Sequence, residues 1–489
     1  MIFYSATLVG VKPIAVEIEI DLSSGLPFFQ IVGLPDAVLK ESKTRVKSAI
    51  IQAGYKFPYE KRVVLNLAPS KVRKEGSGFE LALAARILAT SEQIEVPPKS
   101  VMFLGELALD GHVRCVPEVE ALAFALLEKK EIEIIVVPTE VAPALAQSLN
   151  THVVGIKHIQ ELRQPQWWNQ NTFLKTDESA LSSEVTDLNN KQSIQENLDL
   201  SKLKFSRFWA RHLEIATVGR HHYLLSGPPG CGKTFFAESL KRFLHRSGDE
   251  IDIEQKALDA LYKRHPKEIP WASPHHSASI VGLLGGGVPP RPGALTKAHG
   301  GVLFLDEFLE FNPSVLDSLR EPFEKGFVEI YRAGLHVQFP SRVQVIAASN
   351  PCRCGYWGHF VKACGCLEIN RLKYQARMSG PLFDRFDVKV FCDSPMGNEE
   401  KISSQVILER IKKALEFKSK CGDIKFSKHA QDFLEHKQDA GSLNYRSWLK
   451  VKSLAQTLAV LDFSPEVKMQ NLEEAFRYSE IIFDVKKLK

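Results

Sequence analysis

The segment Gly227–Thr234 reads GPPGCGKT, and this stretch decides the fold expected for the middle of the chain. It matches the phosphate-binding pattern G-x-x-x-x-G-K-[ST]. An apolar strand pattern, Tyr223–Leu225, precedes it and a helical pattern, Phe235–Leu240, follows it. The backbone N–H groups of such a loop point at a phosphate from the positive end of the helix. The residues expected at the phosphates are Gly227, Pro228, Pro229, Gly230, Cys231, Gly232, Lys233 and Thr234.

Acidic and amide side chains follow two further apolar stretches. Val302–Glu307 reads VLFLDE, and it predicts a buried strand ending in Asp306 and Glu307. We expect Asp306 and the Thr234 hydroxyl to hold Mg²⁺, and Glu307 to polarise the attacking water. A later buried strand ends at Asn350, whose amide would orient that water; an asparagine that only caps a loop before a proline is the alternative. Together these features predict an ATP-hydrolysing α/β domain.

Three arginines are candidates for neutralising charge in the transition state. Arg385 lies in SGPLFDRFD, where ring ATPases place an arginine finger that enters the neighbouring subunit's site. A surface ion pair with Asp384 or Asp387 is the alternative. Arg377 is a weaker candidate for the same role. Arg446, early in a helical pattern near the end of the chain, is expected to fold back onto the γ-phosphate, unless it is an ordinary solvated arginine.

Four of the eight cysteines fall in one short segment, at Cys352, Cys354, Cys364 and Cys366. The spacing C-x-C-x₉-C-x-C predicts a tetrahedral structural zinc site in a reducing compartment, and not a disulfide framework. Free thiols are the alternative, and His359 is a possible replacement ligand. A catalytic metal is not expected there, because four thiolates leave no open position.

Composition sets wide bounds on the rest. The 489 residues suffice for about three domains, and the net charge of +5 permits an anionic partner without requiring one. The start of the chain lacks a signal-peptide pattern, and no apolar run approaches membrane-spanning length. We therefore expect a cytoplasmic protein without a membrane partner.

The chain divides into four expected parts. Residues 1–163 alternate strand and helix patterns as an α+β unit, and 164–204 form a polar linker. In that linker, Trp167 and Trp168 are expected to dock the linker onto a neighbouring part of the protein rather than to stack on bases. Residues 205–395 carry the nucleotide motifs, and 396–489 follow a helical pattern.

Long specific strings then identify a family. They include GLPFFQIVGLPDAVLKES at Gly25–Ser42, VVLNLAPSKVRKEGSGFEL at Val63–Leu81, PHHSASIVGLLGGGVPPRPG at Pro274–Gly293 and SNPCRCGYWG at Ser349–Gly358. Over nearly its whole length apart from the linker, the chain resembles the ComM/YifB family of bacterial magnesium-chelatase-like AAA+ ATPases. The resemblance implies a first domain similar to the Lon protease domain (a ribosomal-S5-like fold). It also implies an AAA+ core with a helix-2 insert and a pre-sensor-1 hairpin, and a helical lid.

The activity that this resemblance implies is that of a hexameric motor on DNA. Such a motor would drive branch migration of recombination intermediates during natural transformation, with other recombination proteins as possible partners. The hairpin is expected in VEIYRAGLHVQF at Val328–Phe339. In related helicases such hairpins line the pore, so Arg332 and His336, with Arg291 from the insert, are expected to bind single-stranded or branched DNA. A plain surface hairpin is the alternative, as is a protein-remodelling ATPase like the magnesium chelatase motor.

The sequence departs from this family background at three places. Lon-type proteolysis needs a serine and a lysine, but Ser77 lies one position too early and Glu120 falls near the lysine position. We therefore expect a non-proteolytic first domain, and an ATP-dependent protease is the least favoured function. The segment Phe205–His222 keeps only the later half of the usual motif before the P-loop, which puts the adenine contacts in doubt. Ala272 replaces a frequent arginine.

Overall fold

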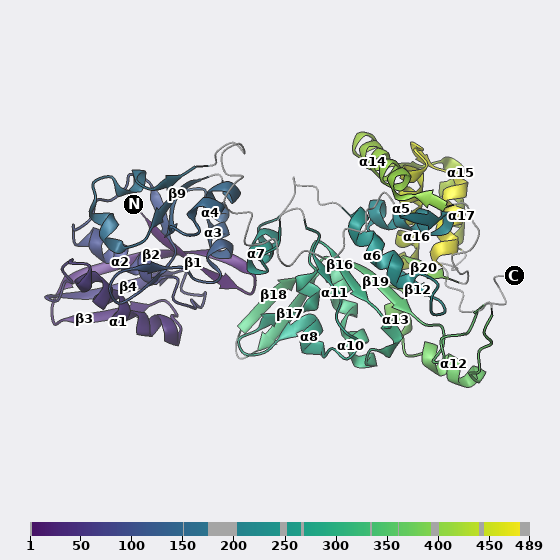
Figure 1. Ribbon diagram of the computed structural model, residues 1–489, viewed down its shortest axis with the longest axis horizontal. Coiled ribbons are helices and arrows are strands. Elements are labelled where there is room, and N and C mark those ends of the chain that lie inside the picture. The colour runs from purple at the N-terminus through teal and green to yellow at the C-terminus, as the bar shows by residue number, and fades with distance from the viewer. Residues whose placement is uncertain are drawn as a thin grey trace. The chain divides into compact units, whose positions relative to one another are not determined.

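The computed structural model describes residues 2–149, 151–174, 203–244, 252–265, 268–332, 335–359, 361–392, 401–439 and 445–479. The chain divides into two compact units, Met1–Gln192 with Gly248–Pro266 and Ser193–Ser247 with Lys267–Lys489. Both units combine helices with a sheet that contains parallel strands (Figure 1). The expected α/β multidomain class is thereby confirmed. None of the described helices is both long and apolar enough to cross a membrane.

The first unit is built on an eight-stranded mixed sheet with the strand order β10-β9-β8-β5-β1-β2-β4-β3. Its strands are β1 (Phe3–Val9), β2 (Lys12–Ser24), β3 (Phe28–Val32), β4 (Lys61–Ala68), β5 (Ser100–Phe103), β8 (Ile132–Pro138), β9 (His152–Ile156) and β10 (Thr172–Phe173), and β6 (Glu106–Leu107) pairs with β7 (Val113–Arg114) separately. The helices are α1 (Ala37–Gln52), α2 (Glu80–Thr90), α3 (Val119–Ala123) and α4 (Ala142–Ser148), with short 3₁₀ helices η1 (Phe124–Glu128), η2 (Ile159–Arg163) and η3 (Trp167–Asn169). Separate apolar clusters join the sheet to α1 and α2, and to α3 and α4.

Two details of this unit differ from the sequence-based boundaries. Helix α7 (Ile253–Leu261) follows the P-loop helix along the chain, yet it belongs to the first unit because Ile253 and Ala260 pack against the α3 and α4 cluster. The predicted start of the linker at residue 164 is also too early, because β10 (Thr172–Phe173) still pairs with β9 of the sheet. Trp167 docks as expected, because its buried indole donates to the Glu95 carbonyl at 2.9 Å. Residues 175–202 of that linker lie outside the described residues.

The second unit contains a five-stranded parallel sheet in the order β13-β16-β19-β12-β20. The strands are β12 (Tyr223–Ser226), β13 (Trp271–Ala272), β16 (Val302–Leu305), β19 (Gln344–Ser349) and β20 (Val388–Phe391). The helices around it are α5 (Arg207–Gly219), α6 (Lys233–Phe243), α9 (Ala294–Lys297), α10 (Pro313–Ser318), α11 (Arg320–Lys325), α12 (Glu368–Gln375) and α13 (Gly380–Phe383), with the 3₁₀ helix η6 (Phe308–Glu310). Parallel strands bring their carboxyl ends to one edge, so the residues that follow β12, β16 and β19 meet there.

Two excursions leave this sheet between its strands. Helix α8 (Ile280–Leu284) leads into β14 (Gly285–Gly286), which pairs with β15 (Arg291–Pro292). Strands β17 (Phe327–Arg332) and β18 (Leu335–Pro340) form the expected hairpin, whose tip at residues 333–334 lies outside the described residues. Gly285 has φ of 109°, and a Cβ there would lie 2.5 Å from the Arg291 carbonyl oxygen and 3.4 Å from Ile330 of β17. The two excursions therefore touch.

The last part of the second unit is helical, as its sequence pattern predicts. Helices α14 (Ser404–Cys421), α15 (Lys428–Asp439), α16 (Tyr445–Leu461) and α17 (Met469–Ser479) surround a short pair of strands, β22 (Lys425–Phe426) and β23 (Glu466–Val467). Strand β11 (Lys204–Ser206) pairs with β21 (Lys401–Ser403). One continuous apolar core includes Leu213 of α5, Leu240 of α6 and Leu454 of α16. The helical lid is thus packed against the nucleotide domain through α5.

Candidate active site

One cavity of about 570 Å³ at the carboxyl edge of the parallel sheet is lined by Asp306, Glu307, Asn350 and the P-loop residues Pro229, Gly230, Gly232, Lys233 and Thr234. The predicted phosphate-binding residues Gly227, Pro228 and Cys231 are not part of this lining. The P-loop ends where α6 begins, and Gly230 and Gly232 turn the chain there with φ of 81° and 96°. The Lys233 ammonium lies against the loop and donates to the carbonyl oxygens of Gly227 at 2.6 Å and Pro228 at 3.0 Å. The sequence motif therefore folds into one concave site.

The thiol of Cys231, in the P-loop, has a lowered pKa. A hydrogen bond with Cys392 of the chain segment after β20, and next the nearby Lys233 ammonium, lower the pKa of the Cys231 thiol to about 7, although burial opposes the shift. A Cβ on Gly227 would lie 2.9 Å from the Cys231 sulfur and 2.4 Å from the Cys392 carbonyl oxygen. Glycine is therefore required at position 227.

The residues expected to hold Mg²⁺ lie together. Thr234 Oγ1 is 3.3 Å from Asp306 Oδ2, and hydroxyl and carboxylate oxygens are the ligands that Mg²⁺ prefers. The pair fits the ion, which would neutralise charge on the β- and γ-phosphates when bound. Thr234 and Asp306 would then supply the protein's share of its ligands.

Glu307 adopts a strained backbone conformation at the mouth of this site. Its φ is 50°, a left-handed value that costs a non-glycine residue about 1 kcal/mol or more. The carboxylate of Glu307 lies 2.9 Å from Nδ1 of His276, in the insert before α8. Sequence reasoning missed His276, because the two residues lie far apart along the chain. The contact gives Glu307 a fixed position beside the cavity.

None of the candidate arginines lines the P-loop cavity of this chain. The buried Arg385 donates to Glu324 of α11 at 2.7 Å, and Arg446 of α16 contacts the same carboxylate oxygen. The expected alternative pairing of Arg385 with Asp384 or Asp387 is not what the structure shows. Within the described lining of the cavity, Lys233 is the single cation. The expectation that Arg446 folds back onto the γ-phosphate of the same chain is therefore not met. Arg446 lies beside Arg385, outside the lining of the nucleotide cavity.

Asp387 and Arg377 have partners of their own. The Asp387 carboxylate accepts from the His222 backbone N–H at 2.8 Å and lies 3.2 Å from Lys450 of α16. Arg377 lies 3.3 Å from Glu310 of η6. Asp387 therefore links the sheet to the lid instead of pairing with Arg385, and Arg377 is held by an acid of the same subunit.

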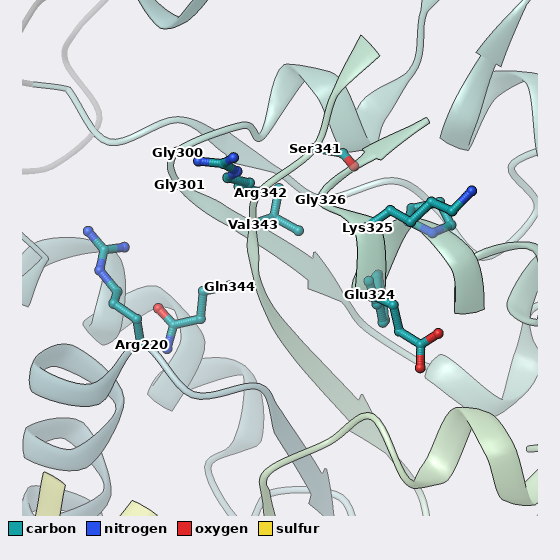
Figure 2. A pocket seen from close by; sticks show the side chains of 12 residues that line it. Arg220, Gly300, Gly301, Glu324, Lys325, Gly326, Ser341, Arg342, Val343 and Gln344 are labelled. Carbon is teal, nitrogen blue, oxygen red and sulfur yellow. The ribbon is translucent and has the colours of Figure 1, made fainter. Parts of the chain in front are cut away.

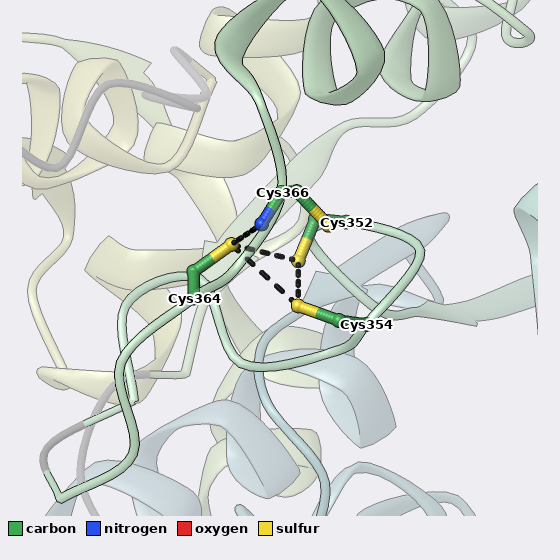
Figure 3. A group of neighbouring side chains, drawn as sticks. All are labelled: Cys352, Cys354, Cys364 and Cys366. Atoms are coloured by element: carbon green, nitrogen blue, oxygen red, sulfur yellow. Dashed lines mark hydrogen bonds between the residues drawn. The ribbon is translucent and has the colours of Figure 1, made fainter.

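The four clustered cysteines converge, and their sulfurs all lie within 4.8 Å of one another (Figure 3). Cys352 is 3.4 Å from Cys354 and 3.7 Å from Cys364. A zinc ion with Zn–S bonds of about 2.3 Å requires sulfurs about 3.8 Å apart, so the group fits zinc. His359 is not part of this group, because its Nδ1 accepts from the backbone N–H groups of Val361 and Lys362.

The loop that carries these cysteines contacts the nucleotide site. A Cβ added to Gly355 would lie 3.2 Å from the Pro229 ring of the P-loop and 4.0 Å from the Asn350 side chain. Gly355 has φ of 83°, which also favours glycine. A metal that orders this loop would therefore stabilise the positions of Pro229 and Asn350.

The expected DNA-contacting residues lie on the two excursions. Arg332 and His336 are exposed on the hairpin, and Arg291 is exposed on β15. Sequence reasoning did not single out Tyr331, which is 68% exposed and stacks on His336 with ring centroids 4.3 Å apart. His336 also lies 3.4 Å from Glu329, which reduces the positive charge of the hairpin. An exposed aromatic pair beside an arginine is a surface on which bases can stack.

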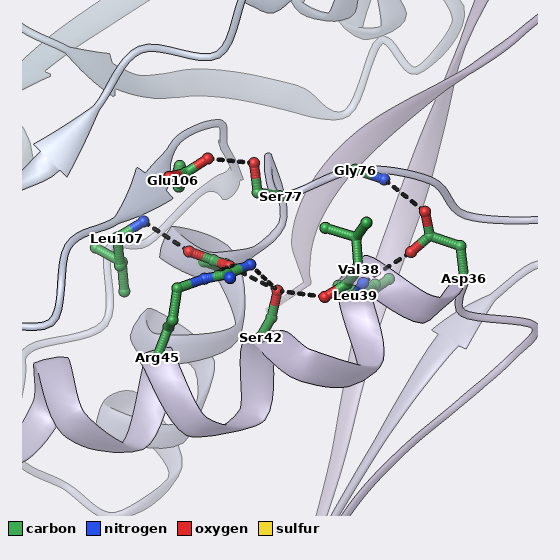
Figure 4. Close-up of polar contacts among 10 residues, drawn as sticks. Asp36, Val38, Leu39, Ser42, Arg45, Gly76, Ser77, Glu106 and Leu107 are labelled. Atoms are coloured by element: carbon green, nitrogen blue, oxygen red, sulfur yellow. Dashed lines mark hydrogen bonds and ion pairs between the residues drawn. The ribbon is translucent and has the colours of Figure 1, made fainter.

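In the first unit, Ser77 contacts Glu106 close to a group of other polar contacts (Figure 4). The Ser77 hydroxyl donates to Glu106, and the buried carboxylate of Glu80 accepts from Ser42 at 2.6 Å and from the Leu107 backbone N–H at 2.8 Å. The ammonium of the nearby Lys74 donates to the Pro69 carbonyl oxygen. Glu120 lies on α3. Ser77 has no lysine partner among the described residues, so the non-proteolytic interpretation stays a prediction.

Comparison with known proteins supplies the family. A family model for magnesium chelatase, subunit ChlI, matches residues 199–400, and one for subunit ChlI of Mg-chelatase matches residues 18–141. Competence protein ComM of Haemophilus influenzae is 33% identical, over 100% of this chain and 99% of its own length. The chain belongs to the ComM/YifB family of magnesium-chelatase-like AAA+ proteins.

The chain is also similar to a second member of this family and, over part of its length, to a more distant protein. The YifB protein of Escherichia coli is 33% identical over 98% of this chain and 97% of its own length. The maternal DNA replication licensing factor mcm6 of Xenopus tropicalis is 25% identical over 38% of this chain and 25% of its own length. The family is ATP-binding, which agrees with the P-loop cavity of the second unit.

Proposed function

We propose that this protein is an ATP-hydrolysing ring motor that moves on DNA, with branch migration of recombination intermediates as its reaction. The observation that carries the proposal is the separation of two half-sites on one subunit. Lys233, Asp306 and Glu307 line the nucleotide cavity, whereas Arg385 and Arg446 gather at Glu324. Each cavity therefore needs a cation from another subunit, and a closed ring, a hexamer in our proposal, supplies one to every site.

The roles of the catalytic residues follow from their positions. Lys233 binds the β- and γ-phosphates, and Thr234 and Asp306 hold Mg²⁺. Glu307 and Asn350 orient the attacking water, and His276 fixes the Glu307 carboxylate until the nucleotide enters. Arg385 and Arg446 carry two positive charges, and Glu324 between them carries one negative charge. The net positive charge of this cluster favours binding of the γ-phosphate held by a neighbouring subunit.

The hairpin and the insert support DNA as the substrate. They touch at Gly285 and Ile330, and they present Arg291, Arg332 and the Tyr331–His336 stack. Hydrolysis would tilt the lid against the sheet and move these groups along a phosphate backbone. The partial match to a DNA replication licensing factor supports the same substrate. The family models are named for a magnesium chelatase subunit, which favours protein remodelling as the second candidate.

ATP turnover with and without four-way or forked DNA tests the choice between these functions. The proposal expects DNA to raise turnover, and Arg332→Ala to weaken this stimulation while sparing the basal rate. The salt dependence of DNA binding should also become shallower in that variant. Lys297→Ala on α9 is a surface control that should keep the stimulation. Turnover that is indifferent to every DNA but raised by a protein partner would favour the remodelling function.

A further inference from the structure

A second cavity, of about 490 Å³, lies at the opposite edge of the parallel sheet from the P-loop (Figure 2). Arg220 precedes β12, Gly300 and Gly301 precede β16, and Arg342 precedes β19, so the amino-terminal ends of three parallel strands surround it. The first and last residues of the hairpin region close its other side, where the Ser341 backbone N–H donates to the Gly326 carbonyl oxygen at 2.8 Å. The cavity therefore lies at the base of the hairpin.

Arg220 and the exposed Arg342 both line this cavity, and neither contacts an acidic side chain among the described residues. Figure 2 shows the Arg220 and Arg342 side chains on the same side of the space, while the Glu324 carboxylate points away from them. Glu324 is already engaged by Arg385 and Arg446. Burial lowers the pKa of the Arg220 guanidinium, which is the cost of a charge that lacks a counter-ion. Arg220 also has φ of 53°, an uncommon conformation for a side-chain-bearing residue.

Buried polar atoms in the same lining also lack partners. Ser341 is 2% exposed and Gln344 is 4% exposed, yet Ser341 Oγ and Gln344 Oε1 have no hydrogen-bond partner in the described part of the chain. The Gln344 amide nitrogen is fixed by the Ala216 and His221 carbonyl oxygens, at 2.9 and 3.0 Å. Its oxygen is thus held as an acceptor. Buried polar groups without partners are rare in proteins and point to a missing ligand or water.

We propose that this cavity is a binding site for a phosphate group, and that the phosphate belongs to a nucleic-acid backbone. Arginines together with a hydroxyl are typical phosphate ligands, and Gln344 Oε1 would accept from a donor of the ligand or from a bridging water. The nucleotide of the ATPase cycle enters at the other edge of the sheet, so it does not explain this site. The hairpin that presents Arg332 starts here, which makes a strand held by the hairpin the nearest source of phosphate. This inference rests on the proposed action on DNA.

The test compares Arg220→Gln, Arg342→Gln and the matched surface control Arg477→Gln, each in full-length protein that also carries Lys233→Ala to disable the P-loop. Fluorescence anisotropy with a labelled thymidine oligonucleotide over a salt series gives affinity and salt slope, and thermal shift with inorganic pyrophosphate tests the free-phosphate source. Each pocket variant should weaken oligonucleotide binding several-fold and reduce the salt slope by about 0.7. The Arg477→Gln protein should match its parent. Thermal unfolding without ligand identifies any variant that fails to fold, and Arg→Met at the same position, which also removes the charge, then replaces it.

Three results would overturn the inference. Unchanged affinity and slope in both pocket variants would show that the cavity does not bind the strand. A loss of pyrophosphate stabilisation with normal oligonucleotide binding would assign the cavity to a free phosphate instead. If the parent protein binds no oligonucleotide at all, the proposed action on DNA fails together with this inference, whereas the first two results leave that proposed function intact.

Discussion

At the scale of single residues, the contacts around Glu307 show how the site holds the carboxylate that we propose activates water. Its left-handed backbone directs the carboxylate toward His276, and its backbone N–H donates to Asp306 Oδ1 at 2.9 Å. The strain and the two contacts keep Glu307 beside the cavity before any nucleotide arrives. The P-loop and the acid pair were predictable because their residues are neighbours in the sequence. His276 and Glu324 were not, because each acts through a partner distant in the sequence.

The first prediction concerns Glu307 itself. Glu307→Gln keeps the shape of the side chain but removes the charge that polarises water, so turnover should fall by at least about 100-fold. ATP affinity should change little, since Lys233 and Thr234 are untouched. Phosphate release and fluorescent-nucleotide binding measure the two quantities. Glu409→Gln, on an exposed position of α14, is the matched control. A Glu307→Gln protein that hydrolyses ATP at the parent rate would remove Glu307 from the mechanism.

At the scale of elements, the cysteine loop between β19 and α12 supports the nucleotide site. Its spacing predicted the four converging sulfurs, but not that Gly355 would pack against Pro229. Packing between loops depends on the tertiary fold, and so does the assignment of α7 to the first unit. Helix α7 was not predicted from the sequence, and an amphipathic pattern alone cannot assign such a helix to a unit, because the same apolar face can pack on either neighbour.

The second prediction concerns this loop. Purified protein should contain about one zinc per chain, and Cys364→Ser should lose it, because three thiolates complete the site poorly. Loss of the metal should loosen the cysteine loop that packs against Pro229 of the P-loop. The affinity for ATP should therefore also fall several-fold. Metal analysis and nucleotide titration check both effects. Cys421→Ser, at an exposed free thiol on α14, should retain zinc and affinity. Full zinc content in the Cys364→Ser protein would contradict the ligand assignment.

At the scale of the whole molecule, buried histidines make stability depend on pH. Burial lowers the pKa of His212 to about 3 and that of His221 to about 4, from an ordinary value of 6.5. His221 also joins the sheet to the lid through a 2.8 Å contact with Thr457 of α16. In the unfolded chain His221 becomes protonated below pH 6.5, whereas in the folded protein it stays neutral until about pH 4. Stability is therefore present above pH 6.5 and is lost as the pH falls toward 4.

The third prediction concerns the contribution of His221 to the pH dependence of stability. Between pH 7.5 and pH 4.5, His221 should contribute a decrease in the free energy of unfolding on the order of 2–3 kcal/mol. His221→Gln should flatten the pH dependence by about that amount, while His429→Gln, on α15, should not. Urea unfolding at several pH values measures the difference. Identical pH profiles for the parent and the His221→Gln protein would show that His221 does not carry this linkage.

The most direct test of the shared site mixes two inactive proteins. Lys233→Ala disables a subunit's own cavity, and Arg385→Ala disables the cation that it lends to a neighbour. In a ring, the cavity of an Arg385→Ala subunit beside a Lys233→Ala subunit is complete, so roughly a quarter of the interfaces in an equal mixture should be active. We predict that each variant alone lacks turnover and that the mixture regains a substantial fraction of the parental rate. A mixture as inactive as its components, or an Arg385→Ala protein active by itself, would contradict the ring mechanism.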